Sequence, residues 1–137
     1  AAVQRGMDAA KAKGAKRAVR LPVSAPFHSS LLGPAAARLK AALVNIDVKA
    51  PHIPVVHNLD AKTRTSPDEI RAALFGQADH PVRWTQCMSH MAASGVTHVL
   101  ECGPGKVLAP LAKRIHAELN GVALVDRQSL EQALQLV

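Results

Sequence analysis

The stretch VTHVLECGPGKV, residues 96–107, decides the fold class of this chain. Residues 96–101 are rich in β-branched and apolar side chains, which predicts a strand. The glycines and proline of residues 103–106 predict a tight turn, and a helix over 107–119 and a short strand over 122–125 follow. A strand, a helix and another strand in this order are typical of an α/β sheet with crossover helices.

The turn at residues 103–106 leaves two interpretations open. Glycines allow close approach of the backbone, and the N-terminus of the following helix favours anions. Such turns lie at the carboxyl ends of strands, where open α/β sheets bind ligands. The turn matches neither the GxxxxGK[ST] nor the GxGxxG pattern, however, so a purely structural turn is the alternative.

The rest of the chain continues the alternation of helices and strands. Gly14 is expected to end the first helix, and Ser66, Pro67 and Glu69 form a capping box before another. The expected helices span 3–13, 31–46, 67–75, 81–94 and 107–119, with a terminal helix capped by Ser129; the expected strands span 21–24, 53–57, 96–101 and 122–125.

One face of the helix expected over 81–94 carries Trp84, Met88 and Met91. A stripe of this kind more often packs into a core than binds a cofactor. We therefore expect these three side chains to belong to the core.

The composition is that of a basic chain with few aromatic residues. Its 137 residues suffice for one domain with a core, and no run of about 18 apolar residues predicts a membrane span. The formal charge of +7 attracts acidic partners. Proteins that bind single-stranded nucleic acid stack bases on aromatic side chains, which make up only 2% here. We expect an acidic protein or a phosphorylated ligand as partner, with no nucleic acid and no membrane.

Cysteine and histidine spacing predicts neither a disulfide framework nor a metal site. Cys87 and Cys102 form no CxxC pair, and the N-terminal residues carry no export signal, so we expect reduced thiols in the cytoplasm. Cys102 is expected to be a small buried apolar residue. None of the seven histidines matches a zinc spacing, and no cofactor is expected.

One histidine is notable for its position. Pro22 and Pro26 prevent the strand expected over 21–24 from continuing, so His28 is expected on a turn. An imidazole that is held in place can accept and return a proton near neutral pH. The alternative is a surface or capping histidine, because the sequence has no GxSxG nucleophile to pair with it.

Four motifs resemble one known family in their order and spacing. They are LPVSAPFHS at 21–29, PVVHNLD at 54–60, PVRW at 81–84 and ECGPGKVL at 101–108. Together they resemble the C-terminal part of the malonyl-CoA:acyl carrier protein transacylases of bacterial fatty-acid synthesis, over essentially the whole chain. Acyltransferase domains of polyketide and fatty-acid megasynthases share the arrangement.

The resemblance implies a reaction and a set of site residues. In that family a serine of a GHSxG motif attacks malonyl-CoA, a histidine is the general base, and malonyl then passes to the phosphopantetheine thiol of an acidic acyl carrier protein. By resemblance, His28 is the general base and the main-chain carbonyl of Gln77 orients its imidazole. Phe27 and Asn58 are implied as substrate-binding residues, and His57 stands where the family often has Asn.

The resemblance also implies an organisation. Residues 1–20 would end a small ferredoxin-like subdomain, and residues 21–137 would form the C-terminal part of a large hydrolase-like, parallel-sheet core. The family's serine, its malonyl-binding arginine and its oxyanion-hole glutamine lie upstream of the matching motifs and are not found here. We therefore expect a missing N-terminal half as partner and no activity from the chain alone. The alternatives are a non-catalytic carrier-protein binding module and a fragment of a polyketide synthase acyltransferase domain.

Overall fold

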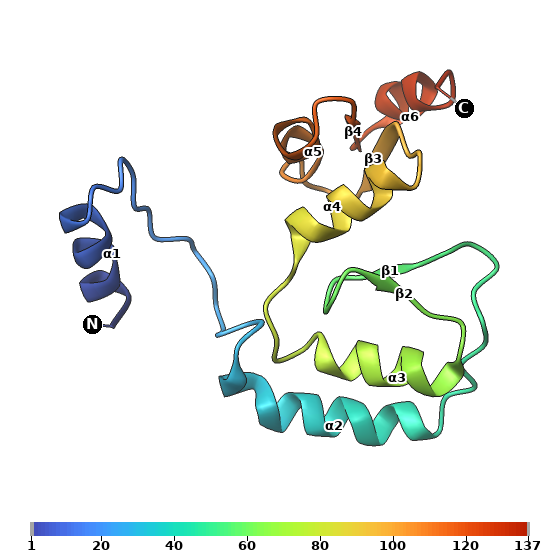
Figure 1. Ribbon diagram of the computed structural model, residues 1–137, viewed down its shortest axis with the longest axis horizontal. Helices are drawn as coiled ribbons and strands as arrows, with labels where there is room; N and C mark the ends of the chain where they lie inside the picture. The colour runs from blue at the N-terminus through green and yellow to red at the C-terminus, as the bar shows by residue number, and fades with distance from the viewer. Residues whose placement is uncertain (1, 137) are drawn as a thin grey trace.

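The computed structural model describes residues 2–136, which have a mixed α/β architecture (Figure 1). The elements in chain order are α1 (Ala2–Ala12), the 3-10 helix η1 (Ser30–Leu32), α2 (Gly33–Val44), β1 (Val56–His57), β2 (Lys62–Thr63), α3 (Pro67–Gly76), α4 (Trp84–Ala93), β3 (His98–Cys102), α5 (Ala109–Ile115), β4 (Asn120–Leu124) and α6 (Arg127–Ala133). The expected α/β class is confirmed, but the described residues form two two-stranded sheets rather than one large parallel sheet.

The stretch that starts at residue 96 folds around a parallel pair of strands. β3 and β4 are in register from His98 opposite Asn120 to Cys102 opposite Leu124. Helix α5 connects the two strands and packs on β4, and α6 also contacts β4. The expected order of strand, helix and strand is thus confirmed, with α5 as the crossover that a parallel pair requires.

The largest buried cluster lies between α4, α5 and the strands. Met88, Ala112 and Leu119 are its fully buried members. Trp84 and Met91 pack against it, which confirms the expected core role of this helix face. Because the cluster is small, the fold leaves many apolar side chains exposed elsewhere.

Helices α2 and α3 pack side by side and run in opposite directions (Figure 1). The buried residues of α2 are Ala36 and Leu43, and those of α3 include Ile70 and Ala73. The strand expected over 53–57 is confirmed only at β1, which pairs antiparallel with β2; the sequence did not predict β2, and the hairpin follows α2 in the chain and precedes α3. This arrangement places the beginning of α2 next to the end of α3.

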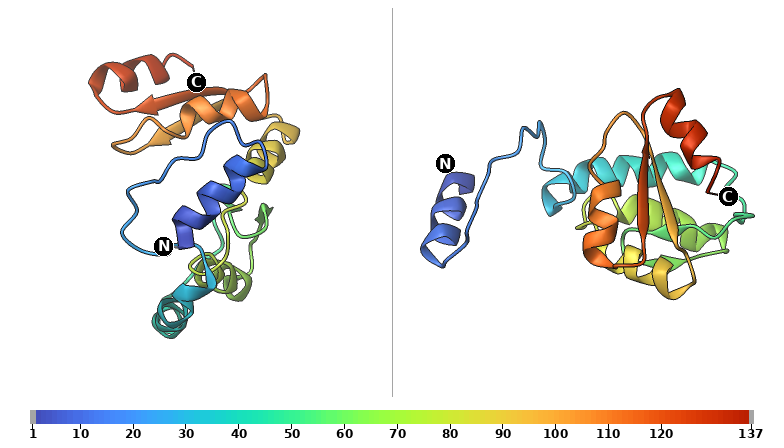
Figure 2. Two further views of the ribbon diagram at one scale, coloured as in Figure 1. Left: turned by 90° about the vertical axis from the view of Figure 1, so that its left-hand side faces the viewer. Right: turned by 90° about the horizontal axis from the view of Figure 1, so that it is seen from above.

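Helix α1 lies apart from the rest of the fold (Figure 2). None of its residues is buried, and Gly14, with φ of 90°, follows its end as expected. The strand expected over 21–24 is wrong, because these residues are irregular and Leu21 and Val23 are 68% and 69% exposed. A strand is stable only with a partner, and none of the strands described within residues 2–136 pairs with this segment.

The caps of two helices differ from expectation. The Ser66 side chain makes no capping hydrogen bond; only its carbonyl accepts, from the N–H of Ile70. Before α6 the cap is Asp126, whose carboxylate accepts from the Ser129 N–H at 2.8 Å, while the Ser129 hydroxyl accepts from the Asp126 N–H at 3.0 Å. Ser129 is therefore the third helical residue of a capping box rather than the cap itself.

Strand β3 is covered on one face only. Its residues alternate between exposed and half-buried, so Cys102 is exposed and the expectation of a buried thiol is wrong. Helices α4 and α5 begin later than expected, at Trp84 and Ala109, because irregular segments precede both. No helix within residues 2–136 is long and apolar enough to cross a bilayer.

Candidate active site

The opposite directions of α2 and α3 bring His28 to Gln77, although 49 positions separate them. His28 lies on the turn before η1, and Gln77 is the C-cap of α3. At the other end of the helix pair, the Arg71 guanidinium donates to the carbonyls of Leu43 at 3.2 Å and Ile46 at 2.9 Å. These two bonds tie the end of α2 to α3.

The hydrogen bond of His28 determines its tautomer. Nδ1 lies 2.9 Å from the main-chain oxygen of Gln77. A carbonyl oxygen can only accept, so Nδ1 carries the proton and the neutral ring keeps its lone pair on Nε2. Within residues 2–136 no hydrogen bond is made to Nε2, and the residue is exposed. An imidazole in this state can accept a proton from a neighbouring hydroxyl or thiol.

The backbone at His28 adopts an uncommon conformation. Its φ of 58° is in the left-handed region, which non-glycine residues avoid at a cost of about 1–3 kcal/mol. The turn is held by the Ser29 hydroxyl, which donates to the Pro26 carbonyl at 2.8 Å. Strain of this kind persists where surrounding contacts fix one orientation of a side chain, here that of the imidazole.

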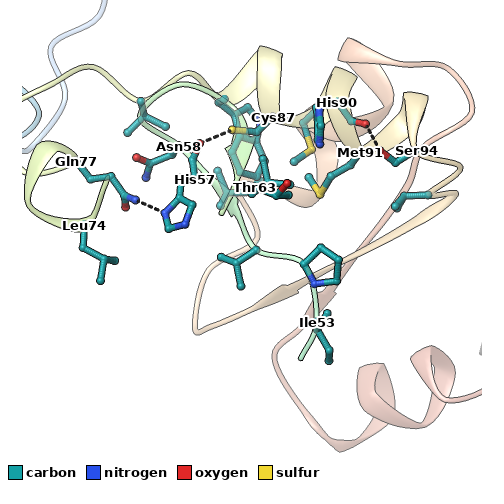
Figure 3. Close-up of a pocket in the computed structure, with 18 residues that line it drawn as sticks. Ile53, His57, Asn58, Thr63, Leu74, Gln77, Cys87, His90, Met91 and Ser94 are labelled. Carbon is teal, nitrogen blue, oxygen red and sulfur yellow. Dashed lines mark hydrogen bonds between the residues drawn. The ribbon is translucent and has the colours of Figure 1, made fainter. Parts of the chain in front are cut away.

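A second histidine contacts the side chain of Gln77. His57 on β1 is only 4% exposed, and its Nδ1 is 3.1 Å from Nε2 of the Gln77 side chain (Figure 3). Burial lowers the pKa of His57, and the nearby Arg64 lowers it further, whereas Asp60 opposes both effects. The neutral imidazole is therefore favoured in the folded protein.

A large apolar cavity of about 990 Å³ adjoins these residues (Figure 3). Its few polar members include His57, Asn58 and Gln77, while Trp84 and Met88 contribute to its apolar wall. Of the residues that the resemblance implies for the site, Gln77 and Asn58 line this cavity, whereas His28 does not line it and is connected to it through its hydrogen bond to Gln77. Phe27 is adjacent to His28 in sequence and is 58% exposed.

A carboxylate of the chain itself already binds the N–H groups that follow the turn at residues 103–106. The Glu101 carboxylate accepts from the N–H groups of Val107 at 3.1 Å, Leu108 at 3.0 Å and Ala109 at 2.8 Å. These bonds, that of Ala109 first, lower the pKa of Glu101. The carboxylate satisfies N–H groups that α5 leaves unpaired, which supports the structural interpretation of the turn. An acidic residue just before a turn and a helix is the signal that sequence reasoning missed.

The other candidate nucleophiles and ligands are less suited to chemistry. Burial raises the pKa of the Cys87 thiol, which disfavours the reactive thiolate. Among residues 2–136 no group of three or more His, Cys, Asp or Glu side chains is placed to hold a metal ion.

Comparison with known proteins shows that the chain is homologous to acyltransferases. The malonyl CoA-acyl carrier protein transacylase of Escherichia coli strain K12 is 49% identical over 135 residues, which are 98% of this chain and 44% of that protein. The protein of the same name from Bacillus subtilis strain 168 is 41% identical over 133 residues, 97% of this chain and 42% of that protein. No family model matches the sequence.

Solved structures agree with this assignment. The acyl-carrier-protein S-malonyltransferase of Burkholderia pseudomallei 1710b gives a TM-score of 0.90 at 54% identity, over 97% of this chain and 43% of that chain. A malonyl-transacylase solved in complex with a type II PKS acyl-carrier protein gives 0.94 at 46% identity, over 99% of this chain and 44% of that chain. The chain is homologous to the malonyl-CoA:acyl carrier protein transacylases, and it spans less than half the length of these relatives.

Proposed function

We propose that this chain is the C-terminal, general-base part of a malonyl-CoA:acyl carrier protein transacylase. The observation that carries the proposal is the hydrogen bond from His28 Nδ1 to the Gln77 carbonyl, which leaves Nε2 free to accept a proton. Homology over nearly the whole chain supports the same reaction class. In this proposal residues 1–20 end a small ferredoxin-like subdomain, and residues 21–137 belong to a hydrolase-like core.

The proposed reaction has two proton-balanced steps. His28 Nε2 takes the proton of a serine hydroxyl as the serine oxygen attacks the malonyl thioester, and the CoA thiolate leaves with that proton. In the second step Nε2 takes the proton of the phosphopantetheine thiol, whose sulfur attacks the malonyl-serine ester. The serine oxygen then leaves and regains the proton. Phe27 and Asn58 would contact the acyl substrate.

The position of the imidazole at the end of α3 suits this role. The Gln77 carbonyl is at the C-terminal end of the helix, where the helix dipole is negative. That sign stabilises the imidazolium that forms when His28 accepts a proton. The hydrogen bond also keeps the ring from turning its protonated nitrogen towards the substrate.

The nucleophilic serine would come from an N-terminal half that packs on the open apolar surfaces. Phe27 and Ile53 are 58% and 79% exposed, and the apolar cavity lies open beside His57. A second polypeptide segment packed on these surfaces would cover their exposed apolar side chains. The chain alone is therefore proposed to be inactive.

The acyl acceptor is proposed to be an acidic acyl carrier protein. One structural relative is in complex with a type II PKS acyl-carrier protein. The formal charge of +7 favours an acidic partner, and CoA carries phosphates as well. The basic side chains proposed for steering are exposed: Lys11, Lys13, Lys16, Arg17, Lys106, Lys113 and Arg114.

The test is a chimaera in which this chain replaces the matching 135 residues of the Escherichia coli relative. We expect it to transfer malonyl from malonyl-CoA to carrier protein. His28→Ala should lower kcat by about 10²–10⁴-fold, the range that a lost general base gives. His52→Ala, at an exposed histidine before β1, is the matched control and should keep full activity.

Two outcomes would contradict the proposal. Unchanged kcat in the His28→Ala chimaera would remove the general-base assignment. Robust transfer by the 137-residue chain alone would show that it needs no second half. If the chimaera is folded but inactive while the chain still binds carrier protein, the chain is a binding module instead.

A further inference from the structure

Gln77 is hydrogen-bonded to two histidines, to one through its main chain and to the other through its side chain. Its main-chain oxygen accepts from His28 Nδ1 at 2.9 Å, and its side-chain Nε2 donates to His57 Nδ1 at 3.1 Å. Gln77 is the residue just after the last residue of α3, and helix ends fray unless their groups are tied down. The Gln77 N–H donates to the Ala73 carbonyl at 3.0 Å, so the two histidines contact the groups of this residue that α3 itself leaves without a partner.

His57 is a firm attachment point for the Gln77 side chain. It is 4% exposed, and its carbonyl accepts from the Ala61 N–H at 2.9 Å and from the Cys87 thiol at 3.8 Å. These bonds connect the His57 backbone to the β1–β2 turn and to α4, and so fix the position of its imidazole. In Figure 3 the Gln77 amide points at the His57 ring from the end of α3.

We propose that His57 is a positioning residue for His28: its neutral imidazole accepts the Gln77 amide at Nδ1 and so holds the Gln77 carbonyl on the His28 ring. The inference deepens the proposed function and rests on it, since His28 is the proposed base. It assigns a role to the Gln77 side chain, whereas the family resemblance implies one only for the carbonyl.

The charges around His57 fit a neutral acceptor. Arg64 and Asp60 form an ion pair at 2.6 Å, and Cys87 lies against the His57 backbone. Burial and Arg64 lower the pKa of His57, while Asp60 acts in the opposite direction. A neutral ring whose Nδ1 accepts must carry its proton on Nε2. His57 and His28 are therefore inferred to be opposite tautomers, Nε2–H and Nδ1–H respectively.

The experiment is NMR of the full chain labelled with ¹⁵N in histidine, which distinguishes the two neutral tautomers of each ring without substrate. His57→Leu removes the acceptor, and Gln77→Ala removes the amide but keeps the main-chain carbonyl. Each should lower the ratio of Nδ1–H to Nε2–H in His28 by about 3-fold or more, as expected for one lost net hydrogen bond.

Further variants separate positioning from general damage. His57→Asn offers an amide oxygen close to the Nδ1 position and should keep the ratio near that of the unmodified chain. The double variant His57→Leu/Gln77→Ala should lower the ratio no more than either single change, because both remove one interaction. His52→Leu is the matched control at an exposed histidine.

An unchanged His28 tautomer ratio in Gln77→Ala would overturn the inference, even if His57→Leu fails to fold. Additive effects of the two changes, or a His57 with its proton on Nδ1, would also overturn it. The measurement needs no turnover, so it is independent of the chimaera assay. An inactive chimaera with the expected tautomer effects would contradict the proposed function alone.

In the active chimaera, His57→Leu should lower kcat about 3-fold or more with little change in the KM for malonyl-CoA, because it disturbs the base and not the substrate contacts. A rise in KM with kcat unchanged would contradict the positioning role.

Discussion

At the scale of single residues, Gly121 shows how one missing side chain permits the parallel pairing. It lies on β4 opposite Val99, where the strand passes the beginning of α5. A Cβ built at Gly121 would be 2.1 Å from the carbonyl oxygen of Ala109. Since this neighbour is backbone, it cannot move aside as a side chain could.

Gly121→Ala should therefore destabilise the fold by about 1–3 kcal/mol, the usual cost of overpacking. The free energy of unfolding from urea titration is the measurement. Gly103→Ala is the matched control, because no atom lies within 4 Å of a Cβ at that position. Equal stability of the two variants would contradict the close approach of β4 to α5.

Glu101 makes stability depend on pH. Its bonds to the N–H groups at and just before the start of α5 lower its pKa below the usual value of about 4.5. A carboxyl with a lowered folded-state pKa stabilises the fold above its unfolded pKa, and this contribution is lost as the pH falls through the folded-state pKa. Glu101→Gln should therefore be less stable at pH about 7, and its deficit should shrink below pH about 4. Urea titrations at the two pH values test this, and a deficit independent of pH would contradict it.

At the scale of elements, the pairing of α2 with α3 positions the candidate site. Arg71 donates to Leu43 and Ile46 at the end of α2, and His28 donates to Gln77 at the opposite end of the pair. Both contacts satisfy carbonyls at or just beyond a helix C-terminus, which have no partner inside the helix. The two helices are thus joined at both ends by side chains that donate to backbone.

Arg71→Met keeps the apolar stem and removes both bonds to the α2 carbonyls. It should cost about 1.5–3 kcal/mol in unfolding free energy, as for hydrogen bonds from a charged group. Asp68→Asn is the control: its ion pair with Arg71 involves an Asp68 side chain that is 95% exposed, so its loss should change little. Similar losses in both variants would assign the stability to the ion pair instead.

At the scale of the whole molecule, α1 and the segment after it contribute little to the core. None of the α1 residues is buried, and the helix lies apart from the other elements (Figure 2). Its exposed apolar residue Val3 is 60% accessible. This part is suited to packing on a partner rather than on the rest of the chain.

Deletion of residues 1–17 should therefore change the unfolding free energy of the chain by no more than about 0.5 kcal/mol. In the chimaera the same deletion should cost stability, because the partner half is present there to cover α1. Urea titration of both proteins measures the difference. A large loss in the chain alone would show that α1 packs on the residues described here.

The order of strand, turn, helix and strand after residue 96, the core face of α4 and the basic charge were all readable from the sequence, because they depend on local periodicity and composition. The family relationship was readable as well, from four short motifs. The extent of the sheets was not. The sequence predicted a strand at 21–24, but strands depend on partners distant in the chain, and none pairs with it among residues 2–136.

The candidate site, too, has features that the sequence predicted and features that only the packing of distant elements determined. The sequence predicted that His28 lies on a turn, and the structure has that turn, although the strand expected before it is absent. Only the tertiary structure decided which nitrogen of His28 carries the proton, and that His57 and Gln77 are linked behind it. Those contacts join residues 49 and 20 positions apart: the first follows from the opposite directions of α2 and α3, and the second from the position of β1 beside the end of α3. Local preferences determine elements, whereas proximity between distant residues depends on how the elements pack.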